Sequence, residues 1–322
     1  MQPKPTGKPT LADVAAAAGV STAAVSYVLR GKQGGCAISP KTAEKILRAA
    51  ADLHYRPDET ARALAALRQA PLRLLVFTPW LYAQFSDFMV RLFAALDREG
   101  VEVRYLPYHT SALQQTLRPA HAGKADVLLV VGTSQQDEQY LTRHRSRYPN
   151  LLLLNRDVPA FPCVRGNDRA ATLALLSPMR GRYPTGCILH SPAPSNCEKE
   201  RIAAFFSLYP QGRVLSPRDL LSPPEQAEGV LYFSPQYVGA ARLLRWLTQA
   251  GVSVPAQAGV AAYDVHSLLQ DFTHLPLCTV DPDIAGMAEA ALGMAQALRA
   301  GETPATVTVP ARPVPGRSAL TD

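Results

Sequence analysis

Residues 10–31, TLADVAAAAGVSTAAVSYVLRG, contain two short helical repeats of apolar residues separated by a glycine and a valine. Thr10 and Ser21 stand at the two starts, where a side-chain hydroxyl can accept a hydrogen bond from a free backbone N–H. Gly19 permits a tight turn between the two repeats. Neither repeat is long enough to form a stable helix alone. The segment therefore predicts two helices that must pack against a third element.

A third helix is predicted to begin at Ser39-Pro40, because serine is a good N-cap and proline fits the first helical position. Pro57 is expected to end it. Each predicted helix has one apolar face: Leu11, Val14, Ala15 and Ala18; then Val25, Val28 and Leu29; then Ala43, Ile46, Leu47, Ala50 and Leu53. Three short amphipathic helices with a tight first turn are typical of a small all-α helix-turn-helix domain.

The positive charge of the chain is concentrated around these helices. The whole chain carries a net charge of +7, and residues 1–68 hold ten Lys and Arg against five Asp and Glu. A basic terminal module on a nearly neutral body indicates a polyanionic partner, most simply nucleic acid. The alternative interpretation is a basic surface that is merely solvated.

The sequence TLADVAAAAGVSTAAVSYVL, followed by ISPKTAEKILRAAADLHYRPDETARALA, resembles the DNA-binding headpiece of the LacI/GalR family of bacterial repressors. The resemblance implies a transcription regulator that binds a palindromic operator as a dimer. It also implies DNA contacts. Ser21, Thr22, Ala23 and Tyr27 would face the major groove, Thr10, Ser26 and Tyr55 would lie near phosphates, and Arg30 would follow the recognition helix. Residues 60–66 would form a hinge helix in the minor groove, with Leu64 wedged between bases, Ala61 on the same side and Arg62 flanking them.

Three departures from the family pattern leave the operator sequence open. Tyr27 stands where arginine is common, and Arg30 stands where asparagine is usual. Ala23 can offer only a methyl contact, for example to thymine. An alternative for Tyr27 is an aromatic ring packed on the phosphate backbone.

From Leu72 onward, short apolar runs recur about every 25–30 residues with helical segments between them. The runs are LRLLVFT, VEVRYL, ADVLLVV and NLLLLN, and after Arg165 they are TGCILH, EGVLYFS and AGVAAY. Alternation of strands and helices at this spacing predicts an α/β body with two parallel sheets.

This second region resembles the two-lobed periplasmic-binding-protein fold that the same family uses as its effector domain. The resemblance is carried by TPWLYAQFSDFMVRLFAAL, VRGNDRAATLAL, EKERIAAF, GVAAYDVHS and GRSAL. We predict a helix-turn-helix domain at 1–57, a hinge helix and linker at 58–70, and a two-lobed effector-binding and dimerisation domain at 71–322. The first lobe is predicted to span about 71–165 plus about 283–305, and the second about 166–282 plus the C-terminal tail.

The resemblance also implies an effector site, with a sugar or sugar derivative as the expected ligand. Arg201 and Asp264 would form its charged pair, since a guanidinium donates to two hydroxyls and a carboxylate accepts from two. Trp80 and Phe85 would stack on the ligand, and Asn167 and Asp168 would lie where the chain crosses between lobes. The structural alternatives are a surface salt bridge for Arg201, a turn cap for Asp264 and a packing role for Trp80. A degenerate cleft that binds a non-sugar metabolite, or nothing, is the alternative function.

Other classes of protein fit the sequence poorly. No phosphate-binding loop, nucleophile elbow or zinc-protease motif occurs, so we expect neither an enzyme nor a bound cofactor. The five cysteines lack metal-ligand spacing and are interpreted as free thiols. No run approaches a membrane span, and the first residues lack the apolar stretch of a signal peptide. We therefore expect a cytoplasmic protein with no membrane partner, and a solute-binding protein is disfavoured.

Overall fold

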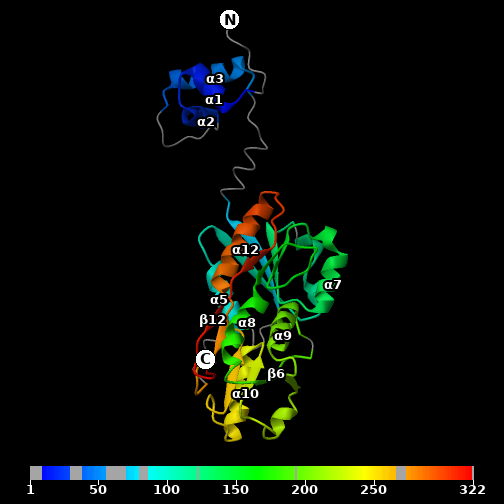
Figure 1. The fold of residues 1–322 in the computed structure, drawn as a ribbon. Helices are drawn as coiled ribbons and strands as arrows, with labels where there is room; N and C mark the ends of the chain where they lie inside the picture. Colours follow the sequence, from blue (N-terminus) through cyan, green and yellow to red (C-terminus); the bar gives the residue numbers. More distant parts are fainter. Residues whose placement is uncertain are drawn as a thin grey trace. The chain divides into compact units, whose positions relative to one another are not determined.

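The structure is a computed structural model, and it describes residues 9–29, 38–55, 70–79, 86–121, 123–192, 194–265 and 273–320. The chain divides into two compact units, Met1–Ala70 and Pro71–Asp322. Figure 1 colours both units along the sequence, and each is described here by itself.

The first unit contains the three predicted helices, α1 (Leu11–Ala18), α2 (Thr22–Leu29) and α3 (Pro40–Asp52). A capping box starts α1: the Thr10 hydroxyl accepts from the Asp13 N–H at 3.3 Å, and the Asp13 carboxylate accepts from the Thr10 N–H at 2.7 Å. Gly19 ends α1 in the left-handed conformation, with φ of 66°. These local signals place the helix boundaries where the sequence predicted them.

The core of the first unit is small and comes from all three helices. Its buried members are Val14, Ala15, Ala18, Val25, Ile46 and Ala50. Two residues that the sequence assigned to apolar faces are exposed instead, Leu11 at 36% and Leu47 at 53%. Leu47 follows the buried Ile46, and one residue is a rotation of about 100° around a helix, so both side chains cannot face so narrow a core.

The first lobe of the second unit is built on a parallel six-stranded sheet with strand order β11-β5-β4-β3-β1-β2. The strands are β1 (Leu72–Pro79), β2 (Val101–Tyr108), β3 (Val127–Val131), β4 (Leu151–Leu154), β5 (Cys163–Gly166) and β11 (Val307–Val309). Helices α5 (Ser86–Leu96) and α12 (Ile284–Arg299) cover one face. The short α6 (Leu113–Thr116) and α7 (Gln135–Arg143) cover the other (Figure 1). The central strands are buried on both faces, as expected for a parallel sheet.

The second lobe repeats this architecture on a parallel four-stranded sheet, in the order β7-β6-β8-β9. The strands are β6 (Thr185–Leu189), β7 (Arg213–Leu215), β8 (Val230–Ser234) and β9 (Ala258–Ala262). Helices α8 (Asp168–Leu176) and α9 (Asn196–Leu208) pack on one face, and α10 (Tyr237–Gln249) packs on the other. The predicted α/β class with two parallel sheets is confirmed.

The chain passes between the lobes three times, after β5, after β10 (Thr279–Asp281) and between β11 and β12 (Arg312–Val314). Strands β10 and β12 pair antiparallel beside these crossings. β11 pairs with β5 in the first sheet, although the sequence analysis assigned residues after 305 to the second lobe. The chain leaving α12 returns to the free edge of the sheet that α12 covers and adds a parallel strand there, and residues 307–309 therefore belong to the first lobe.

No single helix in the described parts of the chain is long and apolar enough to cross a membrane. Taken together, α1 and α2 are long and apolar enough, but the two helices are bent by 104° relative to each other. Their apolar residues form the core of the first unit.

Candidate functional site

The first candidate site is the outward face of α2. Ser21, Thr22 and Ala23 are exposed at its start, while Val25 is fully buried between α2 and its neighbours. The Ser21 hydroxyl caps the helix by accepting from the Ala24 N–H at 3.2 Å. Tyr27 is half-buried, as is Ser26 one position before it. The exposed side chains at the start of α2 are therefore small, and small side chains allow the helix to approach a DNA groove closely.

Other predicted DNA contacts lie around this face or outside the described residues. The exposed Thr10 hydroxyl donates to the Asp13 carboxylate at 2.7 Å, so it completes the cap of α1. Tyr55 is half-buried and packs against the three-helix core. Four predicted contacts, Arg30, Ala61, Arg62 and Leu64, lie outside the part of the chain that the structure describes.

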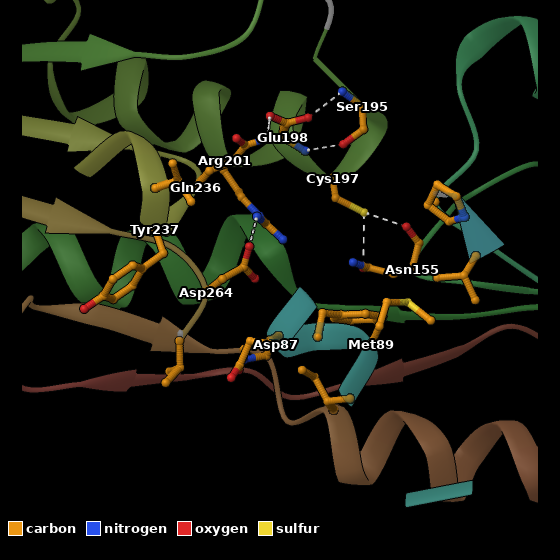
Figure 2. Close-up of a pocket in the computed structure, with 18 of the residues that line it drawn as sticks. Asp87, Met89, Asn155, Ser195, Cys197, Glu198, Arg201, Gln236, Tyr237 and Asp264 are labelled. Carbon is orange, nitrogen blue, oxygen red and sulfur yellow. Dashed lines mark hydrogen bonds and ion pairs between the residues drawn. The ribbon is translucent and has the colours of Figure 1, made fainter. Parts of the chain in front are cut away.

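The second candidate site is a cleft between the two lobes of the second unit. The first lobe contributes residues from the carboxyl ends of β1 and β4 and from α5, and the second contributes the start of α9 and the loops after β8 and β9. Figure 2 shows the cleft side chains converging from both lobes. Ligands of open parallel sheets bind at this end of the strands.

Arg201 lies at the centre of the cleft wall and is only 4% exposed. Its Nε donates to Asp168 at 2.6 Å, and its Nη1 donates to the Pro235 carbonyl at 2.8 Å and to Asp264 at 3.4 Å. The guanidinium carbon also lies 3.5 Å from the centre of the Tyr263 ring. Burial opposes its charge, yet the two carboxylates hold the pKa of Arg201 well above its usual value.

Asp264 is the partner that faces the cleft, because its side chain remains 39% exposed. Burial raises the pKa of Asp264, the charge of Arg201 opposes that shift, and the nearby Asp168 and Glu198 add to it. Asp264 also has a φ of 72°, a conformation that is uncommon outside glycine. A strained acidic residue beside a buried arginine is typical of a binding site.

Sequence reasoning missed Glu198, which lies beside this pair. Glu198 closes the capping box of α9, where its carboxylate accepts from the Ser195 N–H at 2.9 Å. The same carboxylate accepts from Gln236 Nε2 at 2.8 Å (Figure 2). The spacing of Ser195 and Glu198 is a capping-box signal that could have located the start of α9 on the cleft.

The opposite wall contains a second buried arginine that sequence reasoning also missed. Arg156 is 6% exposed, and its Nε donates to the Thr133 carbonyl at 3.1 Å. Cys197, from the other lobe, lies 3.1 Å from the Asn155 carbonyl through its sulfur (Figure 2). Burial raises the pKa of Cys197 to about 11, so the group stays a neutral thiol. Asn155 and Cys197 bring the two lobes into direct contact beside the cleft.

The remaining predicted effector residues have different surroundings. Asp168 lies behind Arg201 and is buried, so it contacts the arginine rather than lining the cleft. Asn167 accepts from the Ala311 N–H at 2.6 Å, which ties two of the lobe crossings together. Trp80 and Phe85 lie outside the described residues. Among the residues that the structure describes, no group of three or more His, Cys, Asp or Glu could hold a metal ion.

Comparison with protein families identifies both parts of the chain. Residues 10–58 match the profile of bacterial regulatory proteins of the lacI family, and residues 196–319 match that of the periplasmic binding protein-like domain. The chain belongs to the lacI family. Its members are DNA-binding transcription regulators, and this chain is such a regulator with a periplasmic binding protein-like domain.

Two curated lacI-family relatives illustrate the similarity. The HTH-type transcriptional regulator GalS of Salmonella typhimurium is 26% identical over 93% of this chain and 92% of its own length. The fructose operon regulatory protein of Vibrio cholerae is 37% identical over 52% of each chain.

Solved structures of the family share the fold. The lac repressor dimer bound to operator and the anti-inducer ONPF has a TM-score of 0.67 at 20% identity, covering 97% of this chain and 99% of that one. The complex of the transcriptional regulator CelR with cellobiose has a TM-score of 0.64 at 17% identity, covering 96% and 99%.

Proposed function

We propose that this lacI-family regulator is a cytoplasmic homodimeric repressor that binds a palindromic operator and is modulated by a small-molecule effector. The observation that carries the proposal is the pairing of an α2 face exposed at its start with a cleft whose wall holds the buried Arg201 beside Asp264. The GalS relative is a transcriptional regulator, and the lac repressor in the similar structure is a dimer on operator DNA. Two headpieces related by twofold symmetry read a palindrome because each meets the same half-site.

In this proposal, α2 enters the major groove with Ser21, Thr22, Ala23 and Tyr27. Thr10, Ser26, Arg30 and Tyr55 contact the DNA backbone around it. Residues 60–66 form a hinge helix with Leu64 in the minor groove and Ala61 and Arg62 beside it. The hinge lies outside the described residues, and its proposed role rests on the family resemblance.

The proposed effector is a sugar or a sugar derivative. Asp264 offers carboxylate oxygens to hydroxyl groups, and Arg201 is held against it by Asp168. The half-buried walls between two lobes suit a ligand that both lobes contact. The similar CelR structure contains cellobiose, and the Vibrio cholerae relative regulates a fructose operon.

Operator binding is tested by selecting bound sequences from random or genomic DNA with the full-length protein. We expect a twofold-symmetric site and an affinity whose logarithm falls linearly with the logarithm of salt concentration, by about 0.9 per phosphate contacted. A promoter that overlaps the selected site should be transcribed less in the presence of the protein. An asymmetric site, or binding indifferent to salt, would overturn this part of the proposal.

The role of α2 is tested by replacing Thr22, Ala23 and Tyr27 together. The preferred bases should change at roughly 1–3 kcal/mol for each altered base contact. Lys41→Ala is the matched control, because Lys41 is exposed at the start of α3 and off that face. It should weaken all sequences alike. An unchanged base preference in the triple variant would assign specificity to another element.

The effector site is tested by a thermal-shift screen of sugars, sugar phosphates and nucleosides on the wild type, Arg201→Ala and Asp264→Ala. A ligand that stabilises the wild type should lose about a hundredfold in affinity for either variant, since its buried partner is left unpaired. Both variants should still bind the operator. Equal stabilisation of all three proteins would show that the ligand binds elsewhere.

A specific observation favours a second candidate, a regulator whose cleft needs no conventional effector. The Arg201 guanidinium is already engaged by Asp168, the Pro235 carbonyl and the Tyr263 ring. A screen in which no compound class stabilises the wild type would favour this candidate.

A further inference from the structure

Five exposed basic side chains of the first lobe have no acidic partner among the described residues. They are Arg118, Lys124, Arg143, Arg145 and Arg147, and we call them the basic patch. No ion pair joins any of them to a carboxylate within 4 Å in the part of the chain that the structure describes. Without an ion pair to a carboxylate, these charges can contact an anionic ligand.

The basic patch is one surface, although its members come from two loops and, for Arg143, from the end of α7. One loop leads from α6 into β3, and the other leads from α7 into β4. The Tyr148 hydroxyl of the second loop donates to the Leu117 carbonyl of the first at 3.3 Å. The Asn150 amide donates to the carbonyls of Ala125 and Asp126 at 3.2 and 3.0 Å. These bonds hold the loops side by side.

The surroundings do not neutralise the patch. Residues 117–126 and 143–150 contain five Lys and Arg and two histidines, but Asp126 is their single acidic residue. Asp126 is itself paired with Arg73, whose Nη2 lies 2.8 Å from its carboxylate. The acidic Glu138 of α7 accepts from Asn196 of the second lobe instead. The two loops therefore present a concentrated positive charge to solvent.

The position of the patch follows from the sheet topology. All strands of the first sheet are parallel, so the loops that precede β3 and β4 lie at the edge where β1 begins. β1 begins at Leu72, two residues after the end of the first unit at Ala70. The Asp126 N–H donates to the Arg73 carbonyl at 2.9 Å, which joins the first loop to the start of β1. The patch is thus at the edge where the chain arrives from the DNA-binding unit.

We propose that the basic patch binds the phosphate backbone of duplex DNA that flanks the operator. The inference rests on the proposed operator binding and adds a second contact surface on the effector domain itself. Four of its five cations are arginines, whose planar guanidinium matches a phosphate with two parallel hydrogen bonds. Phosphate contacts carry no sequence information, so the patch would add affinity and salt dependence without changing the preferred operator.

The test compares two duplexes that contain the same selected operator. One ends at the operator, and the other carries roughly one to two helical turns, about 10–20 bp, of unrelated sequence on each side. The full-length protein is measured as wild type, as Arg145→Gln/Arg147→Gln, and as a charge-matched control, Arg242→Gln/Arg245→Gln. The control arginines are exposed on α10 of the second lobe, away from the strand-start edge of the first sheet.

We expect the wild type to bind the flanked duplex more tightly and with a steeper salt slope than the short duplex. The Arg145→Gln/Arg147→Gln variant should lose part of that difference, with a slope reduced by about 0.9 for each phosphate contact removed. For two lost contacts, a rise from about 50 to 200 mM salt should cost the wild type roughly tenfold more affinity than the variant. Both double variants should bind the short duplex as the wild type does.

Three results would overturn the inference. The flanks could leave wild-type affinity unchanged, the two double variants could respond alike, or Arg145→Gln/Arg147→Gln could weaken both duplexes equally. If the wild type still binds the short duplex in these cases, the proposed function remains supported and only the role of the basic patch is rejected. Failure of the wild type to bind any selected operator would overturn both proposals together.

Discussion

Arg201 contacts two carboxylates and an aromatic ring, and each contact has a different effect. Asp168 supplies a fully buried counter-charge, Asp264 a half-exposed one, and Tyr263 a ring face. The buried pair fixes the position of the guanidinium, and the exposed carboxylate is left for a ligand. The roles of Asp168 and Asp264 therefore differ because only Asp168 is shielded from water.

The buried pair should contribute strongly to stability once formed. Asp168→Asn leaves Arg201 without its 2.6 Å counter-charge, so the free energy of unfolding should fall by about 3 kcal/mol in urea denaturation. The control is Asp126→Asn, which breaks the Arg73 pair, whose arginine is 48% exposed. It should cost less than about 1 kcal/mol. Equal losses in the two variants would show that burial does not set the strength of the pair.

Asp264 should destabilise the folded protein at neutral pH. Its pKa is raised by burial, so the folded state favours the protonated carboxyl. The resulting stabilisation is complete below the unfolded value of 3.8 and is lost as the pH rises through the folded pKa. Asp264→Asn, which also tolerates the positive φ, should therefore raise the midpoint of thermal unfolding at pH 7.5. The gain should shrink toward pH 4, and a gain independent of pH would contradict this account.

At the scale of single elements, capping residues set where the helices of the first unit begin. α1 is only eight residues long, and its start depends on the reciprocal bonds between Thr10 and Asp13. Ser39 caps α3 through one side-chain bond, in which its hydroxyl accepts from the Thr42 N–H at 3.1 Å. Short helices with small cores depend on such local bonds more than long ones do.

Removal of the α1 cap is expected to loosen the first unit alone. Thr10→Ala should destabilise α1 by about 1 kcal/mol, because the Asp13 N–H loses its side-chain acceptor. Hydrogen exchange of the full-length protein should show faster exchange in residues 11–18, and the strands of the second unit should exchange as in the wild type. Faster exchange throughout the chain would mean that the cap supports more than its own helix.

At the scale of the whole molecule, the chain consists of two units of very different size. The first unit is small and has a core of few buried residues, and the second has four buried clusters distributed over two lobes. Small domains bury a smaller share of their surface and are less stable.

The two units should therefore unfold in separate steps. Scanning calorimetry should show an early transition of about 50 kcal/mol for the first unit, at roughly 0.7 kcal/mol per residue. Unfolding of the second unit should follow at higher temperature with about 180 kcal/mol in total. A selected operator should move the early transition upward by mass action. A single transition for the whole chain would contradict this division.

Much of the fold could be predicted from local sequence signals. The caps at Thr10 and Ser39, the turn at Gly19 and the apolar runs that became β1, β3, β4 and β8 each depend on neighbouring residues only. The three-residue strands β7, β10, β11 and β12 could not be predicted in this way. They are too short to show a periodic pattern, and pairing with distant strands makes them strands at all.

The sequence by itself determined the helix-turn-helix domain and the alternation that makes two parallel sheets, and the family resemblance predicted that Arg201 and Asp264 lie together. Tertiary structure alone placed Asp168 behind Arg201, Tyr263 beneath it, and Arg156 of the opposite wall against Cys197 of the second lobe. It also gathered the basic patch from two loops whose hydrogen-bonded residues lie 24 and 31 positions apart along the chain. The physical reason is that burial and charge neutralisation depend on which distant segments meet, and that is set by strand order and lobe crossings rather than by neighbours along the chain.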